Sequence, residues 1–209
     1  MRLPRGRRAA PPIGVVLAGG AGRRLGGDKA VVDLDGRPLL AYPLTALRAA
    51  VGEVAVVAKR DSALPRLDAD VHIWLEPDEP RHPVAGIVRA LKSARGRAVL
   101  VVAVDLPLVP VELLHRLATD RTAPGSLAVL ARAGGRPQPL CGRYEPGALA
   151  VLDGFDPAAR ATELVARLQP ALVEVADEDA LLNVNRPEDL LRASAVRGRR
   201  RRERSVRPR

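Results

Sequence analysis

The chain has 209 residues, which is enough for one domain with a sizeable core and too few for two large ones. Its net charge is +10, and only 2% of its residues are aromatic, so the core must consist of aliphatic side chains. The single cysteine, Cys141, excludes an intramolecular disulfide framework, and no apolar run is long enough to cross a membrane, so we expect a cytoplasmic protein.

The positive charge is concentrated at the two ends of the chain. Residues 1–10 contain four arginines, and residues 197–209 contain eight arginines and one glutamate, so the stretch between them is close to neutral. Since the last segment has almost no apolar side chain to bury, we predict disordered basic tails over 1–10 and 197–209 and a folded domain over 11–196. The tails either bind nucleic acid or acidic surfaces through charge, or are solvated extensions without a function.

Between these tails, short β-branched runs alternate with helical periodicity, a pattern typical of an α/β fold with a mostly parallel sheet. The first half of the chain predicts strands at 13–18, 53–58, 71–75 and 97–104, and helices at 39–50, 84–94 and 110–118. Farther on, segments 126–132 and 138–144 flank two adjacent glycines and predict an antiparallel hairpin. The last predicted elements are helices at 158–168 and 187–195 and a strand at 171–175.

The first predicted strand runs into a glycine-rich loop, LAGGAGRRLGGDK, which spans residues 17–29. Glycine lets the backbone turn tightly and brings several N–H groups close to one anion. Arg23, Arg24 and Lys29 add positive charge, and a lysine serves well as a point-charge ligand for phosphate. Because ligands bind beyond the carboxyl ends of parallel strands, we favour a triphosphate-binding loop over a simple surface turn.

Two common phosphate-binding motifs are excluded for this loop. A Walker A loop requires Ser or Thr after its lysine, whereas Ala30 follows Lys29. A dinucleotide-binding fingerprint needs a third glycine where Leu25 stands, and it leads directly into a helix, whereas residues 31–40 predict a short strand and a turn.

The loop instead resembles the signature of the molybdenum cofactor guanylyltransferase family, L-A-G-G-x-x-x-R-M-G-x-D-K, with leucine in place of the methionine. The matching residues are Leu17, Ala18, Gly19, Gly20, Arg24, Gly26, Asp28 and Lys29. Related cytidylyltransferases usually carry L-A-A-G, so Gly19 indicates a guanine nucleotide, whose larger base would gain room from the missing methyl group. The resemblance covers about residues 13–195 and implies a Rossmann-like, three-layer nucleotidyltransferase fold (GT-A-like) with a small antiparallel excursion.

The resemblance also implies a reaction, the transfer of GMP from GTP to the phosphate of molybdopterin with release of pyrophosphate. Residues 17–20 would contact the nucleotide, and Arg24 and Lys29 would neutralise charge that develops on the phosphates. No protein nucleophile is needed for such a direct transfer, so the catalytic contribution would be positioning and electrostatics.

A carboxylate follows the strand predicted at 97–104, in the sequence Asp105-Leu106-Pro107. An aspartate at a strand end is well placed to hold Mg²⁺ against triphosphate oxygens, although aspartate also commonly forms turns there. The family has C-D-x-P-F at this position with a metal-binding aspartate, so the resemblance implies Asp105 as the ligand of a Mg²⁺ cofactor.

The loop EPDEPRHPVAG, residues 76–86, resembles a family segment that ends in G-P-L-A-G and follows an acidic residue that recognises guanine. A carboxylate accepts hydrogen bonds from guanine N1–H and from its amino group, and both Glu76 and Asp78 are candidates. A solvated acidic turn is the alternative. The family often has a nucleotide-contacting asparagine just after its second strand. The aligned residues here are Ala58, Lys59 and Arg60, and whether Lys59 takes over that role is open.

Two further segments are candidates for the acceptor side. The sequence Asn183-Val184-Asn185 before a Pro-Glu-Asp helix start resembles the family's N-x-N-T-P-E-D-L, which implies that Asn183 and Asn185 contact the substrate or metal. Arg136 lies where relatives hold the acceptor and is a candidate for its phosphate, with a plain hairpin turn as the alternative.

Two other functions remain open at this point. One is the same reaction with CTP or with another phosphorylated acceptor, such as a sugar phosphate or phospholactate. The other is a non-enzymatic nucleotide- or nucleic-acid-binding protein with basic arms. Deletion of residues 1–10 and 197–209 separates the classes, because the enzyme hypothesis expects turnover to survive it.

Overall fold

The computed structural model describes residues 10–20, 25, 27–120 and 123–206. Four parallel strands form the first part of its main sheet: β1 (Ile13–Leu17), β4 (Val54–Ala58), β5 (His72–Leu75) and β6 (Val99–Ala103). Every residue of β4 and β6 is buried, and strands that are covered on both faces need a nearly continuous apolar sequence. All four agree with the predicted strands to within two residues at each end.

Three more strands complete a seven-stranded sheet in the order β5-β4-β1-β6-β8-β7-β9. β8 (Arg136–Tyr144) runs antiparallel to β6 and to β7 (Ala128–Ala133), and β9 (Ala171–Glu174) is parallel to β7. β7 and β8 form the predicted hairpin, whose turn residues Gly134 and Gly135 both have positive φ, a conformation that favours glycine. Because β8 is paired with β6, the antiparallel excursion is an integral part of the sheet.

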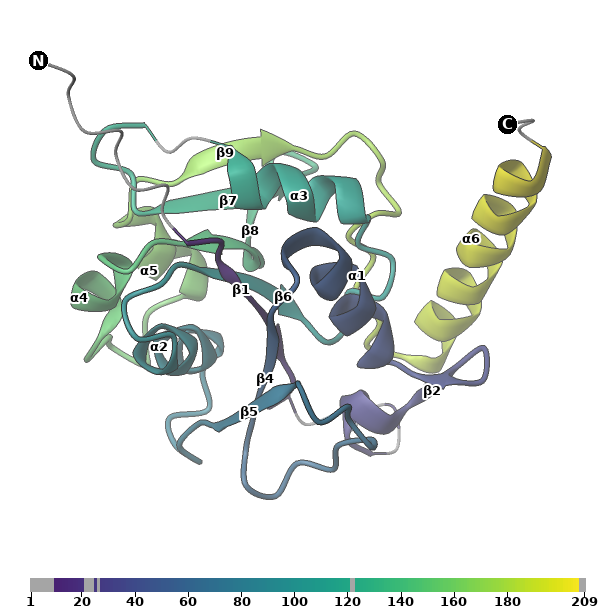
Figure 1. Ribbon diagram of the computed structural model, residues 1–209, viewed down its shortest axis with the longest axis horizontal. Coiled ribbons are helices and arrows are strands. Elements are labelled where there is room, and N and C mark those ends of the chain that lie inside the picture. The colour runs from purple at the N-terminus through teal and green to yellow at the C-terminus, as the bar shows by residue number, and fades with distance from the viewer. Residues whose placement is uncertain (1–9, 21–24, 26, 121–122, 207–209) are drawn as a thin grey trace, which may run out of the picture.

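Helices cover both faces of the sheet, and the fold therefore has three layers (Figure 1). α1 (Ala41–Val51) and α3 (Val111–Thr119) pack on one face through their leucines. α2 (Pro83–Ser93), α4 (Ala148–Leu152) and α5 (Ala161–Ala166) pack on the other face. The expected three-layer α/β fold is confirmed, although α5 is shorter than the helix predicted there.

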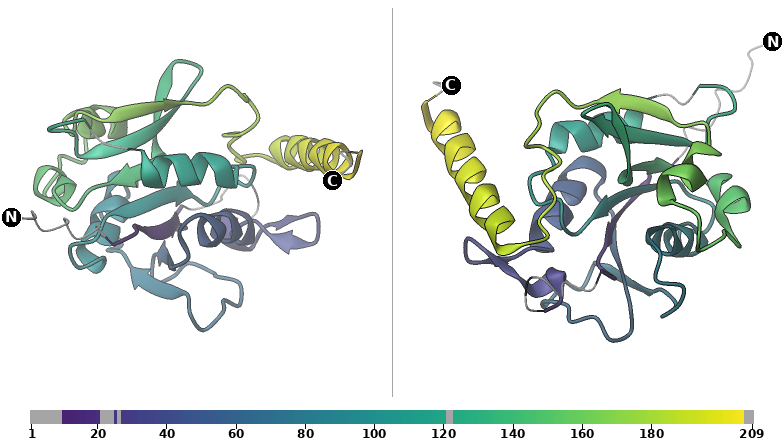
Figure 2. Two further views of the ribbon diagram at one scale, coloured as in Figure 1. Left: turned by 45° about the horizontal axis from the view of Figure 1, so that its top comes forward. Right: turned by 180° about the vertical axis from the view of Figure 1, so that it is seen from behind.

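A third apolar cluster lies beside these layers, under α6 (Pro187–Val206). The segment after the glycine-rich loop forms a short 3-10 helix, η2 (Lys29–Val31), and a hairpin of β2 (Asp33–Leu34) and β3 (Arg37–Pro38). The predicted short strand and turn correspond to β2 and the hairpin turn, whereas η2 and β3 were not predicted. α6 packs against this hairpin at its N-terminal half, and its C-terminal half extends away from the sheet (Figure 2).

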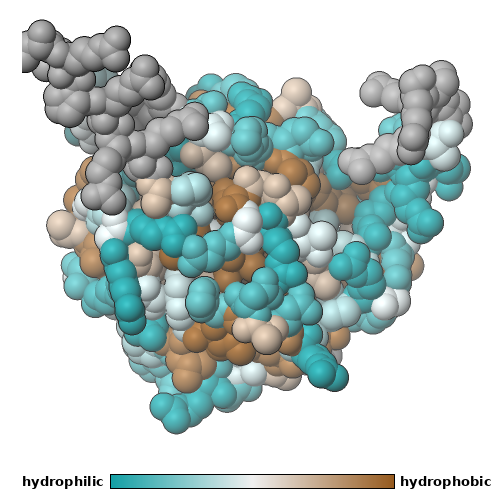
Figure 3. Space-filling model, viewed as in Figure 1, coloured by the Kyte–Doolittle hydropathy of each residue, from teal (hydrophilic) through white to brown (hydrophobic). Residues whose placement is uncertain are grey.

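The prediction of a disordered tail is wrong for residues 197–206, because α6 continues to Val206 and the expected domain boundary at 196 falls inside it. Arginine is a good helix former, and here Arg199 and Arg200 also form ion pairs with Asp179 and Asp177. Hydrophilic side chains cover the side of the molecule on which α6 lies (Figure 3). The rest of the predicted tails, 1–9 and 207–209, lies outside the described residues.

Within the described ranges, no helix combines the length and the apolar character that a bilayer-crossing segment needs.

Candidate active site

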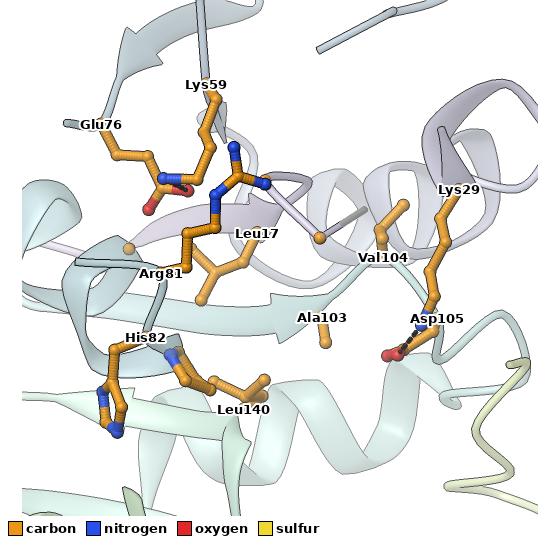
Figure 4. A pocket seen from close by; sticks show the side chains of 14 residues that line it. Leu17, Lys29, Lys59, Glu76, Arg81, His82, Ala103, Val104, Asp105 and Leu140 are labelled. Carbon is orange, nitrogen blue, oxygen red and sulfur yellow. Dashed lines mark hydrogen bonds and ion pairs between the residues drawn. The ribbon is translucent and has the colours of Figure 1, made fainter. Parts of the chain in front are cut away.

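A cleft of about 500 Å³ opens at the carboxyl ends of the four parallel strands (Figure 4). Leu17 ends β1, Lys59 follows β4, Glu76 follows β5, and Asp105 follows β6 after one intervening residue. The other residues that line the cleft come from the glycine-rich loop, the start of α2, β6 and β8: Gly19, Gly20, Lys29, Arg81, His82, Pro83, Gly86, Ala103, Val104 and Leu140.

One end of the cleft carries a cluster of Lys29, Asp105 and Asn185. The Lys29 Nζ donates hydrogen bonds to Asp105 Oδ2 at 2.8 Å and to Asn185 Oδ1 at 2.5 Å. The side chains of Lys29 and Asp105 are only 13% and 18% exposed, so this ion pair is stronger than an ordinary surface pair. Three segments far apart in the sequence thus meet at one ammonium group.

Backbone hydrogen bonds hold this cluster in place. The Val184 N–H donates to the carbonyl oxygen of Asp105 at 2.9 Å, which ties the segment of Asn185 to the end of β6. Asp189 Oδ2 accepts from the N–H groups of Asn185 and Arg186, both at 2.9 Å, and so caps the start of α6. The proline, glutamate and aspartate at this helix start therefore have the structural role that their types favour, while Asn185 faces the site.

The Asp105 carboxylate has the properties of a metal ligand. Its Oδ1 atom is buried and has no hydrogen-bond partner among the residues that the structure describes, and an unpartnered buried oxygen of this kind carries a desolvation cost. The Asn185 Oδ1 atom accepts a hydrogen bond from the same ammonium group, that of Lys29, and offers a neutral oxygen ligand. These oxygens fit a hard divalent cation, which prefers oxygen ligands.

In the described part of the chain, no group of three or more His, Cys, Asp or Glu side chains gathers at one point. A cation at Asp105 would therefore need further ligands from water or from a phosphorylated substrate, which is the usual arrangement for Mg²⁺.

Lys59 and Glu76 occupy the other end of the cleft (Figure 4). Their side chains are 7% and 8% exposed, and the Lys59 Nζ lies 3.5 Å from Glu76 Oε1. The same ammonium group donates to the carbonyl oxygens of Pro77 at 2.6 Å and Asp78 at 3.1 Å. Burial raises the pKa of the Glu76 carboxyl group, and the positive charge of Lys59 opposes that rise.

Two glycines provide the space for the Glu76 carboxylate. A Cβ atom at Gly19 would lie 1.9 Å from Glu76 Oε1, and one at Gly86 would lie 3.2 Å from Oε2. The sequence analysis assigned the space at Gly19 to the base of the nucleotide, whereas the structure fills it with the carboxylate. The first glycine of L-A-G-G, Gly19, is thus required by a side chain 57 positions farther along the chain.

The structure distinguishes the two acidic candidates. Glu76 lines the cleft, whereas Asp78 is exposed and contributes only its carbonyl oxygen, to Lys59. Lys59 is buried, and its ammonium group contacts Glu76 and the loop that follows it.

The remaining predicted residues are placed as follows. Leu17, Gly19 and Gly20 line the cleft, but Ala18 is buried, and its N–H donates to the carbonyl oxygen of Val57 at 2.8 Å. Arg24 lies outside the described residues.

Asn183 and Arg136 are not brought to the cleft lining. Asn183 is exposed, and its amide donates to the carbonyl oxygen of Leu181 at 3.4 Å. Arg136 is exposed at the start of β8, beside the hairpin turn. Both remain predictions for the acceptor side.

Arg81 and Leu140 line the cleft without having been predicted. Arg81 precedes α2, pairs with Glu79 at 3.3 Å and extends its side chain into the cleft (Figure 4). The signal that could have identified Arg81 is the proline of His82-Pro83, which marks a helix start near the strand ends. His82 itself caps α2: its Nδ1 accepts from the Val84 N–H at 3.2 Å, and its Nε2 lies 3.1 Å from the carbonyl oxygen of Ala159.

The fold has three layers, and a glycine-rich loop, a lysine–carboxylate–amide cluster and a buried carboxylate lie at the ends of its parallel strands. This combination is that of a nucleotidyltransferase. Residues 14–174 match the family model of the MobA-like NTP transferase domain, and the chain belongs to this family.

Curated relatives and solved structures agree with this assignment. A molybdenum cofactor guanylyltransferase of Cereibacter sphaeroides is 40% identical over 191 residues, which cover 88% of this chain and 96% of that protein. A protein of the same name from Pseudomonas putida is 36% identical over 188 residues, with coverages of 87% and 97%. The crystal structure of molybdopterin-guanine dinucleotide biosynthesis protein A from Archaeoglobus fulgidus, 23% identical, shares the fold with a TM-score of 0.72 over 89% of this chain and 98% of that one.

Proposed function

We propose that this protein transfers GMP from GTP to the terminal phosphate of molybdopterin, with release of pyrophosphate and with Mg²⁺ as its metal ion. The observation that carries the nucleotide assignment is the buried Glu76 carboxylate between Gly19 and Gly86. The names of the relatives support the acceptor.

Glu76 is proposed to recognise the base. An ionised carboxylate accepts hydrogen bonds from both guanine N1–H and the exocyclic amino group. Cytosine has no N1–H to donate, and adenine presents an acceptor at N1, so neither base matches. This recognition requires Glu76 to be ionised despite its burial, and the nearby ammonium group of Lys59 favours the ionised form.

Lys29 and the glycine-rich loop are proposed to hold the triphosphate. The Lys29 ammonium group lies at the opposite end of the cleft from Glu76, where the phosphates of a nucleotide bound through its base would lie (Figure 4). A fixed positive charge there stabilises the negative charge that spreads over the α-phosphate and the leaving pyrophosphate. Gly19 and Gly20 let the backbone approach these groups closely, and Arg24 is proposed to add a second cation.

Asp105 and Asn185 are proposed to hold the metal ion through Oδ1 of each side chain. Mg²⁺ bound there would supply charge neutralisation at the phosphate oxygens. Nucleotidyltransferases of this type generally use a divalent metal, which agrees with the oxygen ligands present. Asn183 and Arg136 are retained as candidates for contacting the acceptor.

The direct test measures thermal unfolding with GTP, CTP, ATP and UTP, each with and without Mg²⁺, because a ligand that binds the native state raises its unfolding temperature. We expect the largest shift with GTP and Mg²⁺. Pyrophosphate release is then measured with molybdopterin, with a sugar phosphate and with phospholactate as acceptors. Faster release with CTP would refute the guanylyl assignment, and turnover only with another acceptor would refute molybdopterin as the substrate.

A further inference from the structure

Three segments bring Lys29, Asp105 and Asn185 together, and all three contact α6. Lys29 begins η2, which leads into the β2–β3 hairpin; the loop that contains Leu108 follows Asp105, and the loop of residues 175–186 contains Asn185. Leu34, Leu108 and Val184, one from each segment, pack in the same apolar cluster. Ala193 and Val196 of α6 complete that cluster.

Arg197 and Ser194 of α6 hold the hairpin. The Arg197 Nη1 lies 3.4 Å from Asp35 Oδ2 at the hairpin tip, and the Ser194 hydroxyl donates to Asp35 Oδ1 at 2.5 Å. The Arg197 guanidinium also stacks over the ring of Tyr42, 4.1 Å from its centroid, and the Tyr42 hydroxyl donates to the carbonyl oxygen of Leu34. The segment after Lys29 is therefore fixed at two points.

Arg200 joins the other two segments through a single guanidinium group. Its Nη1 donates to the carbonyl oxygen of Leu108 at 2.9 Å, and its Nη2 donates to Asp177 Oδ2 at 2.7 Å. Leu108 lies three residues after Asp105, and Asp177 lies in the loop that leads to Asn185. The planar fork of arginine can hold two acceptors in fixed directions, which a lysine cannot do.

Asp179, in the same loop, is also held by α6. Its two carboxylate oxygens accept from Arg192 at 2.8 Å and from Arg199 at 3.1 Å. By contrast, Arg201 is exposed and forms no ion pair within the described part of the chain. Some arginines of α6 thus form ion pairs with the rest of the domain and others do not, and the partners of the former lie on the segments of the site.

We propose that the arginines of α6 that contact these segments, Arg192, Arg197, Arg199 and above all Arg200, are positioning residues of the active site. They keep the Lys29–Asp105–Asn185 cluster in its working geometry by tying its three source segments to one helix. A displacement of about 1 Å at a reacting centre lowers a rate by about 100-fold, so even a modest loosening is measurable. This proposal rests on the proposed function in one respect, that GMP transfer takes place at this cluster.

The test compares Arg200→Ala with the matched control Arg201→Ala. We expect Arg200→Ala to lower kcat by about tenfold while the KM for GTP and the preference for GTP change little, because Glu76 lies at the far end of the cleft (Figure 4). Arg201→Ala should behave as wild type. Arg200→Lys keeps the charge toward Asp177 and should recover part of the loss; it also replaces the alanine variant if that variant does not fold.

Hydrogen exchange gives a second readout that needs no substrate. In Arg200→Ala the amides of Leu106, Val109 and Val184 should exchange faster than in the control, at an unfolding temperature within a few degrees of it. Unchanged exchange and kcat in a folded Arg200→Ala protein would overturn the proposal, and so would an equal loss of kcat and of GTP preference. If the wild type does not turn over GTP, the proposed function fails, while hydrogen exchange still tests the positioning role. The proposal also reverses the sequence-based expectation that turnover survives removal of residues 197–209.

Discussion

Gly19→Ala is the substitution whose effect the structure defines most sharply. The new Cβ would lie 1.9 Å from Glu76 Oε1, 3.0 Å from its Cδ and 3.5 Å from Lys59 Cγ. Real Cβ atoms essentially never approach another atom closer than 3.0 Å, so the Oε1 atom has to retreat by about 1 Å or more. The carboxylate is the end of a flexible side chain and can move without unfolding the protein, but the movement takes it out of its position between Gly19 and Gly86.

The retreat of the carboxylate should cost base recognition rather than stability. A hydrogen bond to a charged group is worth about 1.5–3 kcal/mol, so its loss corresponds to about 10- to 150-fold in selectivity. We therefore expect the ratio of kcat/KM for GTP to that for ATP or CTP to fall at least about tenfold in Gly19→Ala. Glu76→Gln removes the charge without crowding and should show the same loss.

Steady-state pyrophosphate release with each nucleotide measures this ratio. Gly27→Ala is the control, since Gly27 is exposed in the same loop, has open space where a Cβ would be added, and does not line the cleft. If Gly19→Ala keeps the wild-type kcat/KM for GTP and the wild-type preference, Glu76 does not read the base and the argument from the two glycines is wrong.

Three further predictions follow from the site. The raised pKa of Glu76 means that its carboxyl group becomes protonated at a higher pH than an ordinary carboxyl group, so the preference for GTP should fall in mildly acidic buffer in the wild type but not in Glu76→Gln. The same raised pKa means that the free energy of unfolding decreases as pH rises through the pKa of Glu76. Urea titrations at several pH values would detect this decrease. Asp105→Asn should lower kcat/KM by at least about 100-fold with an unfolding temperature close to wild type, and near-normal activity at saturating Mg²⁺ would remove Asp105 from the site. Lys29→Ala should lower kcat/KM for GTP by about 10- to 100-fold, whereas an unchanged value would mean that Lys29 only balances the charge of Asp105.

Much of the fold, and the composition of the end of the cleft where Lys29 lies, follow from the sequence alone. The strands β1, β4 and β6 are short apolar runs followed within two residues by Gly19, Lys59 and Asp105, so local pattern already indicates where they begin and end. Since carboxyl ends of parallel strands meet at one edge, the loops that follow the first and last of them predict that Lys29 and Asp105 belong to one site. Their direct contact, across 76 positions of sequence, is visible only in the structure.

Only the tertiary structure decided the arrangement at the other end of the cleft, where Glu76 lies. Glu76 and Asp78 are equivalent as sequence, and the backbone of their loop turns one carboxylate into the cleft and the other into solvent. The partner of Gly19 could not be identified either, because the clash with Glu76 depends on two loops packing side by side. The role of Lys59 depends on the same packing, since its acceptors are loop carbonyl groups that any residue type would offer.

The same reason explains the arginine-rich end of the chain. Residues 197–206 have a charged composition that predicts disorder when they are considered alone, because a segment without apolar side chains cannot bury a core of its own. In the folded protein Asp35, from far away in the sequence, and Asp177 and Asp179, from the loop before α6, supply the partners of these arginines. Local composition therefore identifies the segments that carry the positive charge. That residues 197–206 are helical depends on aspartates of other segments, which only the tertiary structure brings close to them.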